Sequence, residues 1–193
     1  KGDFVPSGYE MRFGSGKIDR IDTCEDDDKV YVKVTDYKTG MKTFDITAFY
    51  HGLQIQLPVY LNAALSIEEK KHPDREVCPA GIFYYRIQDP FVDRADTAGK
   101  GERSILKELR LDGLVNGDEQ AVDHLEHGLS GTSVLFPMGK NKDGSISKAS
   151  RVLAPDDFRT MLAYTKIMEE ELKEKMYGGE VQAQPYEMNG DSG

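Results

Sequence analysis

Two aspartates and a lysine in the first part of the chain are spaced so that they could perform hydrolytic chemistry together. Asp19 lies in one β-rich run, Asp36 and Lys38 lie in the next, and the acidic stretch 26–28 separates the runs. This arrangement is typical of a β-hairpin. With the turn centred on the last two aspartates of that stretch, Asp19 falls opposite Asp36, and alternation puts Lys38 on the same face. The pattern predicts two carboxylates and one ammonium at the open end of a hairpin.

The other residues on that face, Ile21, Val32 and Val34, are apolar. Two carboxylates beside an apolar floor repel each other and lose hydration, so they require a proton or a cation. Mg²⁺ is suitable because it prefers oxygen ligands and commonly takes only one or two protein carboxylates. Lys38 would then lie near the attacking water of a metal-assisted hydrolysis. On spacing alone, a surface hairpin with an ordinary Asp–Lys pair explains the same residues.

The wider sequence pattern resembles a known nuclease family. Asp19 followed by Asp36-Tyr37-Lys38 resembles the core of the PD-(D/E)XK nuclease superfamily. The segments GKIDRID, VTDYKTG and YHGLQIQLPVYLNAAL, in this order and at close spacing, are similar to the RecB-type nuclease domain of AddB-type proteins. The similarity covers essentially the whole chain, because it continues through PAGIFYYRIQDPF, KELRLDGLVNGD, APDDFRTMLAYTKIMEEEL and YGGEVQAQPYE.

The resemblance implies a fold and a set of roles. The fold is α/β and restriction-endonuclease-like, with a central mixed β-sheet flanked by helices. Asp19, Asp36 and the main-chain carbonyl of Tyr37 would bind Mg²⁺, for which Mn²⁺ can substitute. Lys38 would position the attacking water for phosphodiester hydrolysis.

A helix is predicted over residues 47–71, with an apolar stripe that includes Leu53 and with Pro58 at a kink or in the first proper turn. Gln56 and Tyr60, four residues apart, share one face of this helix. They match the family's QxxxY motif, which the resemblance associates with contacts to the DNA backbone or support of the catalytic lysine. The alternative is a polar helix edge with a half-buried tyrosine.

For the function, the resemblance implies a Mg²⁺-dependent DNA exonuclease domain of a bacterial, cytoplasmic helicase–nuclease complex that processes double-strand breaks for recombinational repair. DNA and an AddA-type helicase/nuclease subunit would be its partners. The family's iron–sulfur cluster uses one cysteine upstream and three beyond this region. Cys24 and Cys78 match none of them, so we expect a cluster only in a full-length protein and weak or no activity in the isolated domain. The alternatives are a catalytically silent DNA-holding or subunit-docking domain, or a stand-alone RecB-like exonuclease.

Length and composition favour a single domain that spans residues 1–193. A chain of 193 residues with 38% hydrophobic and 31% charged residues can form a sizeable core. No apolar run approaches the length of a membrane span, and no signal peptide opens the chain. The net charge of −9 argues against a free-standing DNA-binding protein. A bound metal ion and a basic channel in a larger assembly would answer that objection. The short connection at residues 14–15 and the absence of an initiator Met suggest a fragment.

The remaining patterns predict further elements. Asp22 should form an exposed ion pair with Lys33, and the turn 26–28 lacks the glycine and glutamate of a calcium loop. A basic cluster contains Lys100, Arg103, Lys107 and Arg110, and either touches phosphates or is a solvated face. We also predict strands at 9–13 and 77–88, helices at 104–114 and from Pro155 to Gly178, turns at 116–118 and 141–144, and a frayed tail at 180–193.

Overall fold

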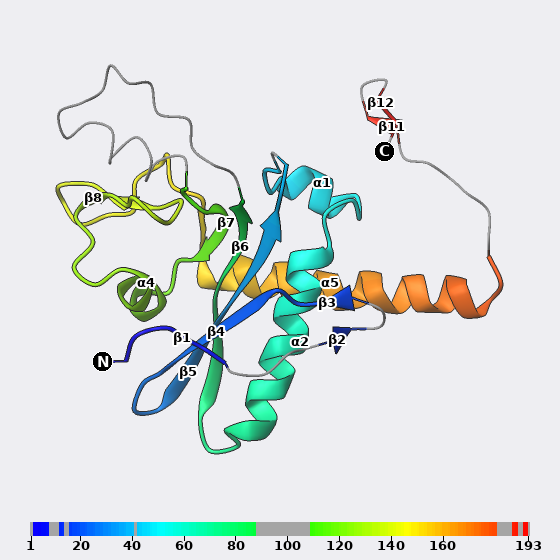
Figure 1. Cartoon of the computed structure of the whole chain (residues 1–193), viewed down its shortest axis with the longest axis horizontal. Coiled ribbons are helices and arrows are strands. Elements are labelled where there is room, and N and C mark those ends of the chain that lie inside the picture. Colours follow the sequence, from blue (N-terminus) through cyan, green and yellow to red (C-terminus); the bar gives the residue numbers. More distant parts are fainter. Residues whose placement is uncertain are drawn as a thin grey trace.

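The structure is a computed structural model that describes residues 2–7, 12–13, 16–40, 42–87, 109–180, 187–188 and 191–192. Figure 1 shows its elements in sequence colours. In chain order they are β1 (Val5–Pro6), β2 (Arg12–Phe13), β3 (Gly16–Lys17), β4 (Arg20–Glu25), β5 (Lys29–Lys38), α1 (Ile46–Tyr50), α2 (Gln56–Lys71), β6 (Glu76–Arg86), β7 (Asp112–Asn116), α4 (Glu119–Leu125), β8 (Gly131–Thr132), β9 (Gly139–Lys140), β10 (Val152–Leu153), α5 (Pro155–Tyr177), β11 (Glu187–Met188) and β12 (Asp191–Ser192).

A mixed β-sheet forms the centre of the molecule, and its strands in the described residues lie in the order β1-β4-β5-β6-β7-β10. β4 and β5 pair antiparallel as a hairpin, whereas β5 and β6 run parallel. A parallel pair needs a crossover connection, and α1 and α2 supply it. β7 is antiparallel to β6 and parallel to β10. The predicted α/β fold with a mixed, helix-flanked sheet is therefore confirmed.

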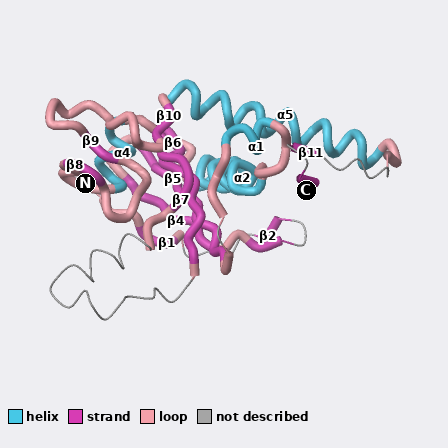
Figure 2. The backbone as a smooth tube through the Cα atoms, turned by 90° about the horizontal axis from the view of Figure 1, so that it is seen from above, coloured by secondary structure: helices cyan, strands magenta, loops and turns pink. Residues whose placement is uncertain are grey.

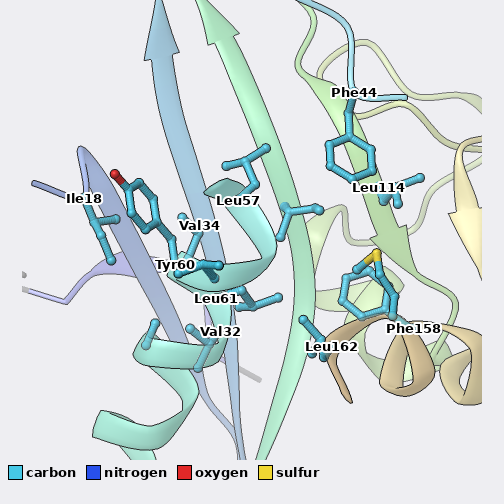
Figure 3. Packing of buried hydrophobic residues seen from close by; sticks show 14 of the residues in the cluster. Ile18, Val32, Val34, Phe44, Leu57, Tyr60, Leu61, Leu114, Phe158 and Leu162 are labelled. Carbon is cyan, nitrogen blue, oxygen red and sulfur yellow. The ribbon is translucent and has the colours of Figure 1, made fainter. Parts of the chain in front are cut away.

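Helices cover both faces of this sheet (Figure 2). α2 and α5 lie on one face, and α4 lies on the other. The larger core fills the space between the sheet and α2 and α5, and it contains Val32 and Val34 of β5, Leu57 of α2 and Phe158 of α5 (Figure 3). Since alternate residues of a strand share a face, the next position after Val34 on this side is Asp36. The hydrophobic pattern of β5 thereby turns Asp36 toward the end of α2.

The single helix predicted over residues 47–71 is wrong, because the chain forms two helices with a turn between them. The Asp45 side chain caps α1 by accepting a backbone N–H bond at 2.8 Å. Gly52 follows with a φ of 81°, a left-handed conformation that favours glycine and breaks the helix. Leu53, predicted on the buried stripe, consequently lies in the turn and is 45% exposed. The second helix starts at Gln56, which places Pro58 in its first turn, as predicted.

The helix predicted over residues 104–114 is also wrong in its described part. Asp112–Asn116 form strand β7, and residues 104–108 lie outside the described residues. Gly113, which the sequence pattern marks as a helix stop, lies within this strand with a φ of 151°. A Cβ atom at this position would be 2.0 Å from the carbonyl oxygen of Ile82 in β6. The glycine is therefore explained by the close approach of two strand backbones.

We expect Gly113→Ala to lower the free energy of unfolding by about 1–3 kcal/mol from backbone strain, with the clash against β6 adding to this loss. Gly144→Ala is a matched control, since Gly144 has a φ of 84° but no heavy atom within 4 Å of the added Cβ. Urea denaturation of both variants measures the difference. Equal losses in the two variants would show that the β6–β7 contact imposes no constraint.

Asp22 and Lys33 lie opposite each other, as the hairpin register predicts, but the expected exposure is wrong. Asp22 is 0% exposed and Lys33 is 8% exposed. The Asp22 carboxylate accepts hydrogen bonds from Lys33 Nζ at 2.7 Å and from Arg20 Nε at 2.9 Å. Burial comes from the N-terminal segment, whose strand β1 pairs with β4 and places Pro6 beside Asp22, while the Phe4 ring lies 5.3 Å from Lys33 Nζ.

Other described elements agree with the sequence patterns. β6 (Glu76–Arg86) lies over most of the strand predicted at 77–88, of which residue 88 is outside the described residues. Its residues Phe83 and Tyr84 are buried, which supports the core interpretation of these aromatics. Asp118, the last residue of the predicted turn 116–118, caps α4. An antiparallel bridge between Lys140 and Ile146 closes the predicted hairpin tip.

Helix α5 begins at Pro155 and ends before Gly178, as predicted. Leu172, predicted on its buried stripe, is 46% exposed because the C-terminal part of α5 extends past the sheet (Figure 1). Of the strand predicted at 9–13, Arg12–Phe13 form β2, and residues 9–11 lie outside the described residues. None of the helices in the described ranges is both long and apolar enough to cross a membrane.

Candidate active site

The open end of the β4–β5 hairpin brings the predicted carboxylates together. The ladder has the register expected from the sequence, with Arg20 opposite Thr35. One further step places Asp19 opposite Asp36, just before β4 begins. The Asp19 carboxylate accepts a hydrogen bond from the Tyr37 N–H at 2.8 Å, so it lies against the C-terminal end of β5.

Asp36 occupies the buried side of this site. Asp36 is 3% exposed, and its Oδ2 atom lies 2.6 Å from Lys38 Nζ. Burial raises the pKa of Asp36 above its usual value, the Lys38 ammonium opposes this rise, and the neighbouring Asp19 carboxylate adds to it. The Lys38 charge does not fully compensate the buried carboxylate. A further cation between the two carboxylates would do so.

One atom of this carboxylate has room for a ligand. The ion pair with Lys38 lacks hydrogen-bond geometry, and Asp36 Oδ2 is among the buried polar atoms without a hydrogen-bond partner in the described residues. Buried polar atoms are normally satisfied, so this oxygen fits coordination of a cation. Within the same residues no group of three or more Asp, Glu, His or Cys side chains is arranged so that it could hold a metal ion. Two carboxylates with a main-chain carbonyl suit Mg²⁺, which keeps several waters when bound to proteins.

Gln56 and Tyr60 connect helix α2 to the lysine. Lys38 Nζ donates to Gln56 Oε1 at 3.3 Å, and Gln56 Nε2 donates to the Tyr60 hydroxyl at 3.0 Å. Tyr60 is 8% exposed, and its ring lies among core residues (Figure 3). A buried tyrosine thus anchors the glutamine that holds the head of Lys38. By contrast, Gln54 bonds to the backbone of residues 43 and 45, in the turn region.

Two residues of β6 at the site were not predicted from the sequence. In the parallel β5–β6 ladder, Tyr84 pairs with Asp36 and Arg86 pairs with Lys38. Burial and the charges of Asp36 and Asp112 raise the pKa of Tyr84 to about 12, so its hydroxyl keeps its proton. The alternation of Tyr84 and Arg86 along the strand is a visible signal, but no local pattern shows which strand pairs with β5.

The predicted basic cluster contributes one described residue. Arg110 donates from Nε and an Nη atom to the Phe136 carbonyl, at 2.9 and 2.7 Å. Together with Lys38, Arg110 also lines a pocket beside the site. The other members of the predicted cluster, Lys100, Arg103 and Lys107, lie outside the described residues.

The mixed sheet, with Asp19, Asp36 and Lys38 at the end of its hairpin, has the architecture of a nuclease fold, and comparison with known proteins identifies the class. The chain matches the model of the PD-(D/E)XK nuclease superfamily over residues 1–188, and it belongs to this family.

Its relatives include AddB proteins, each named as a subunit of an ATP-dependent helicase/deoxyribonuclease. The one from Alkaliphilus metalliredigens (strain QYMF) is 38% identical over 100% of this chain. Those from Thermoanaerobacter sp. (strain X514) and Clostridioides difficile (strain 630) are 35% and 34% identical, each over 96% of the chain. The chain spans 18% of the length of each of these relatives.

Proposed function

We propose that this chain is the Mg²⁺-dependent DNA exonuclease domain of a bacterial helicase–nuclease complex that processes double-strand breaks for recombinational repair. Membership of the nuclease superfamily supports phosphodiester hydrolysis. The names of the relatives, which combine helicase and deoxyribonuclease, support a helicase partner and a DNA substrate. The proposed partner is an AddA-type subunit, and the proposed location is the cytoplasm.

The observation that carries the proposal is the state of Asp36. It is a buried carboxylate whose Oδ2 atom lacks a hydrogen-bond partner, beside a second carboxylate and an ammonium. Such a group is unfavourable unless a cation or a substrate group completes it. A purely structural hairpin would gain nothing from this arrangement.

Each residue of the site has a role that follows from its position. Asp19, Asp36 and the Tyr37 carbonyl would hold the metal ion. When bound, the ion supplies positive charge for the phosphate oxygens and acidifies a water molecule. The Lys38 ammonium, held by Gln56, orients the attacking water and stabilises the charge that develops on the phosphate.

Metal binding by the intact protein that contains this chain tests the proposal. We expect Mn²⁺ to give anomalous density between Asp19 and Asp36 in soaked crystals. Asp36→Asn keeps the size of the side chain and removes its charge. It should weaken Mn²⁺ binding by more than the ~10–100-fold lost with an outer partner of a metal ligand, and cleavage of DNA in Mg²⁺ should fall with it.

Asp143→Asn is the control, because Asp143 is an exposed carboxylate that bonds to Ser145 at a hairpin tip. It should leave metal binding and cleavage unchanged. If the unaltered protein neither binds Mn²⁺ nor cleaves DNA, or if Asp36→Asn cleaves normally, the domain is a DNA-holding or docking module instead.

A further inference from the structure

Three buried side-chain polar atoms have no hydrogen-bond partner in the described part of the chain: Asp36 Oδ2, the Tyr84 hydroxyl and Arg86 Nε. They belong to one place, because Tyr84 pairs with Asp36 and Arg86 pairs with Lys38 across neighbouring strands. A buried polar group without a partner is unfavourable and uncommon, so three together indicate a missing ligand. A bound metal ion would account for Asp36 Oδ2. It does not account for the other two, which present hydrogen-bond donors.

Tyr84 and Arg86 line a pocket of about 140 Å³ next to the candidate metal site. Lys42 closes it from the loop after β5, with its Nζ atom 5.3 Å from the centre of the Tyr84 ring. In the described residues, neither Lys42 nor Arg86 forms an ion pair with a carboxylate. The charged residues of the lining are Lys38, Lys42, Arg86, Arg110 and Asp112.

The charge of this pocket is unbalanced. Its lining includes four cationic side chains and the single carboxylate of Asp112. Asp112 is already engaged, since it accepts the Phe44 N–H at 2.7 Å and lies 3.4 Å from an Nη atom of Arg151. Lys38 pairs with Asp36, but Lys42 and Arg86 have no carboxylate partner in the described residues, and like charges gathered in one pocket repel one another. An anion in the pocket would remove that repulsion and satisfy the unpaired donors.

We propose that this pocket binds a backbone phosphate of the DNA strand next to the phosphate that is cleaved, with Tyr84 and Arg86 donating to its oxygens. The proposal rests on the proposed nuclease function. A guanidinium matches phosphate geometry and a lysine adds point charge, so the residue types fit this ligand. Lys38 lines the pocket and also pairs with Asp36. The phosphate in the pocket and the phosphate that is cleaved would therefore lie on opposite sides of the Lys38 side chain. Arg86 and Tyr84 are thus positioning residues that set where the strand lies.

Binding of a fluorescent single-stranded oligonucleotide to the intact protein tests this pocket without catalysis, since the measurement is made in EDTA. We expect Arg86→Met to weaken binding roughly tenfold or more. It should also lower the slope of log K against log[salt] by about 0.7, because one phosphate contact is lost. Tyr84→Phe should weaken binding less and leave the slope unchanged, because it removes a donor without removing charge. A merely structural role for Arg86 would not change the slope.

Arg86→Lys and Arg159→Met complete the design. Arg86→Lys keeps the positive charge, so the slope of log K against log[salt] should stay unchanged. A loss of binding caused by misfolding would not be restored by keeping the charge. Arg159 is a surface residue of α5 paired with Asp156, so its replacement should alter nothing. An unchanged affinity and an unchanged salt slope in Arg86→Met would overturn the proposal. It would also be overturned if the Arg86 variants bound DNA normally and differed from the unaltered protein only in binding inorganic phosphate. If the unaltered protein binds DNA through Arg86 but does not cleave it in Mg²⁺, the nuclease function fails and the phosphate pocket remains.

Discussion

We expect Lys38→Met to lower the rate constant of DNA cleavage by about 10²–10³-fold, the loss typical when one group that stabilises charge in the transition state is removed. Lys38 Nζ is held by two contacts, 2.6 Å from Asp36 Oδ2 and 3.3 Å from Gln56 Oε1. Methionine keeps the aliphatic stem and removes only the ammonium. The measurement is the single-turnover rate at saturating DNA and Mg²⁺.

Lys29→Met is the matched control for this variant. Lys29 lies at the opposite end of the same strand, where it pairs with Glu76 at 3.8 Å, so its loss should leave cleavage unchanged. Lys38→Met should still bind Mn²⁺, which distinguishes it from Asp36→Asn. Normal cleavage by Lys38→Met would exclude a catalytic role for the ammonium.

The second large effect concerns stability. We expect Asp22→Asn to lower the free energy of unfolding by about 3–5 kcal/mol, because it leaves the buried Lys33 ammonium beside Arg20 without a counter-charge. The double variant Asp22→Leu/Lys33→Met should recover much of this loss, since replacing both members of a buried pair by apolar groups is often neutral. Lys29→Met, at a more exposed pair, should cost less than about 1 kcal/mol. Urea denaturation at neutral pH measures all three.

The same ion pair predicts an acid dependence. Burial raises the pKa of Asp22, but its hydrogen bonds with Arg20 and Lys33 outweigh that effect and the net pKa lies below its usual value of 3.8. A carboxyl with a lowered folded pKa contributes stability above its unfolded pKa, and this contribution is lost as the pH falls through the folded pKa. The stability difference between the unaltered protein and Asp22→Asn should therefore be constant above pH 3.8 and shrink below it. A difference that grows on acidification would contradict this assignment.

The local register of the β4–β5 hairpin could be read from the sequence, because a tight turn and period-two alternation fix which residues face each other. That is why the pairing of Asp22 with Lys33 was predicted correctly. The exposure of this pair was predicted wrongly, because exposure depends on whether another segment covers the pair. Phe4, from another part of the chain, lies against Lys33. Glycine was ambiguous for a similar reason. Gly52 ends a helix, whereas Gly113 admits a neighbouring strand, and only the packing separates the two cases.

The sequence by itself determined the register of the hairpin, because this register depends on residue types at short spacing. Its resemblance to a nuclease family also determined the family and the candidates Asp19, Asp36, Lys38, Gln56 and Tyr60. Only the tertiary structure decided that β6 runs parallel to β5, since that pairing joins residues about fifty positions apart in the chain through a helical crossover. This pairing places Tyr84 and Arg86 beside the carboxylates and creates the basic pocket. Contacts of this kind are chosen by the burial of whole helices and strands, and a local pattern of residues carries no record of them.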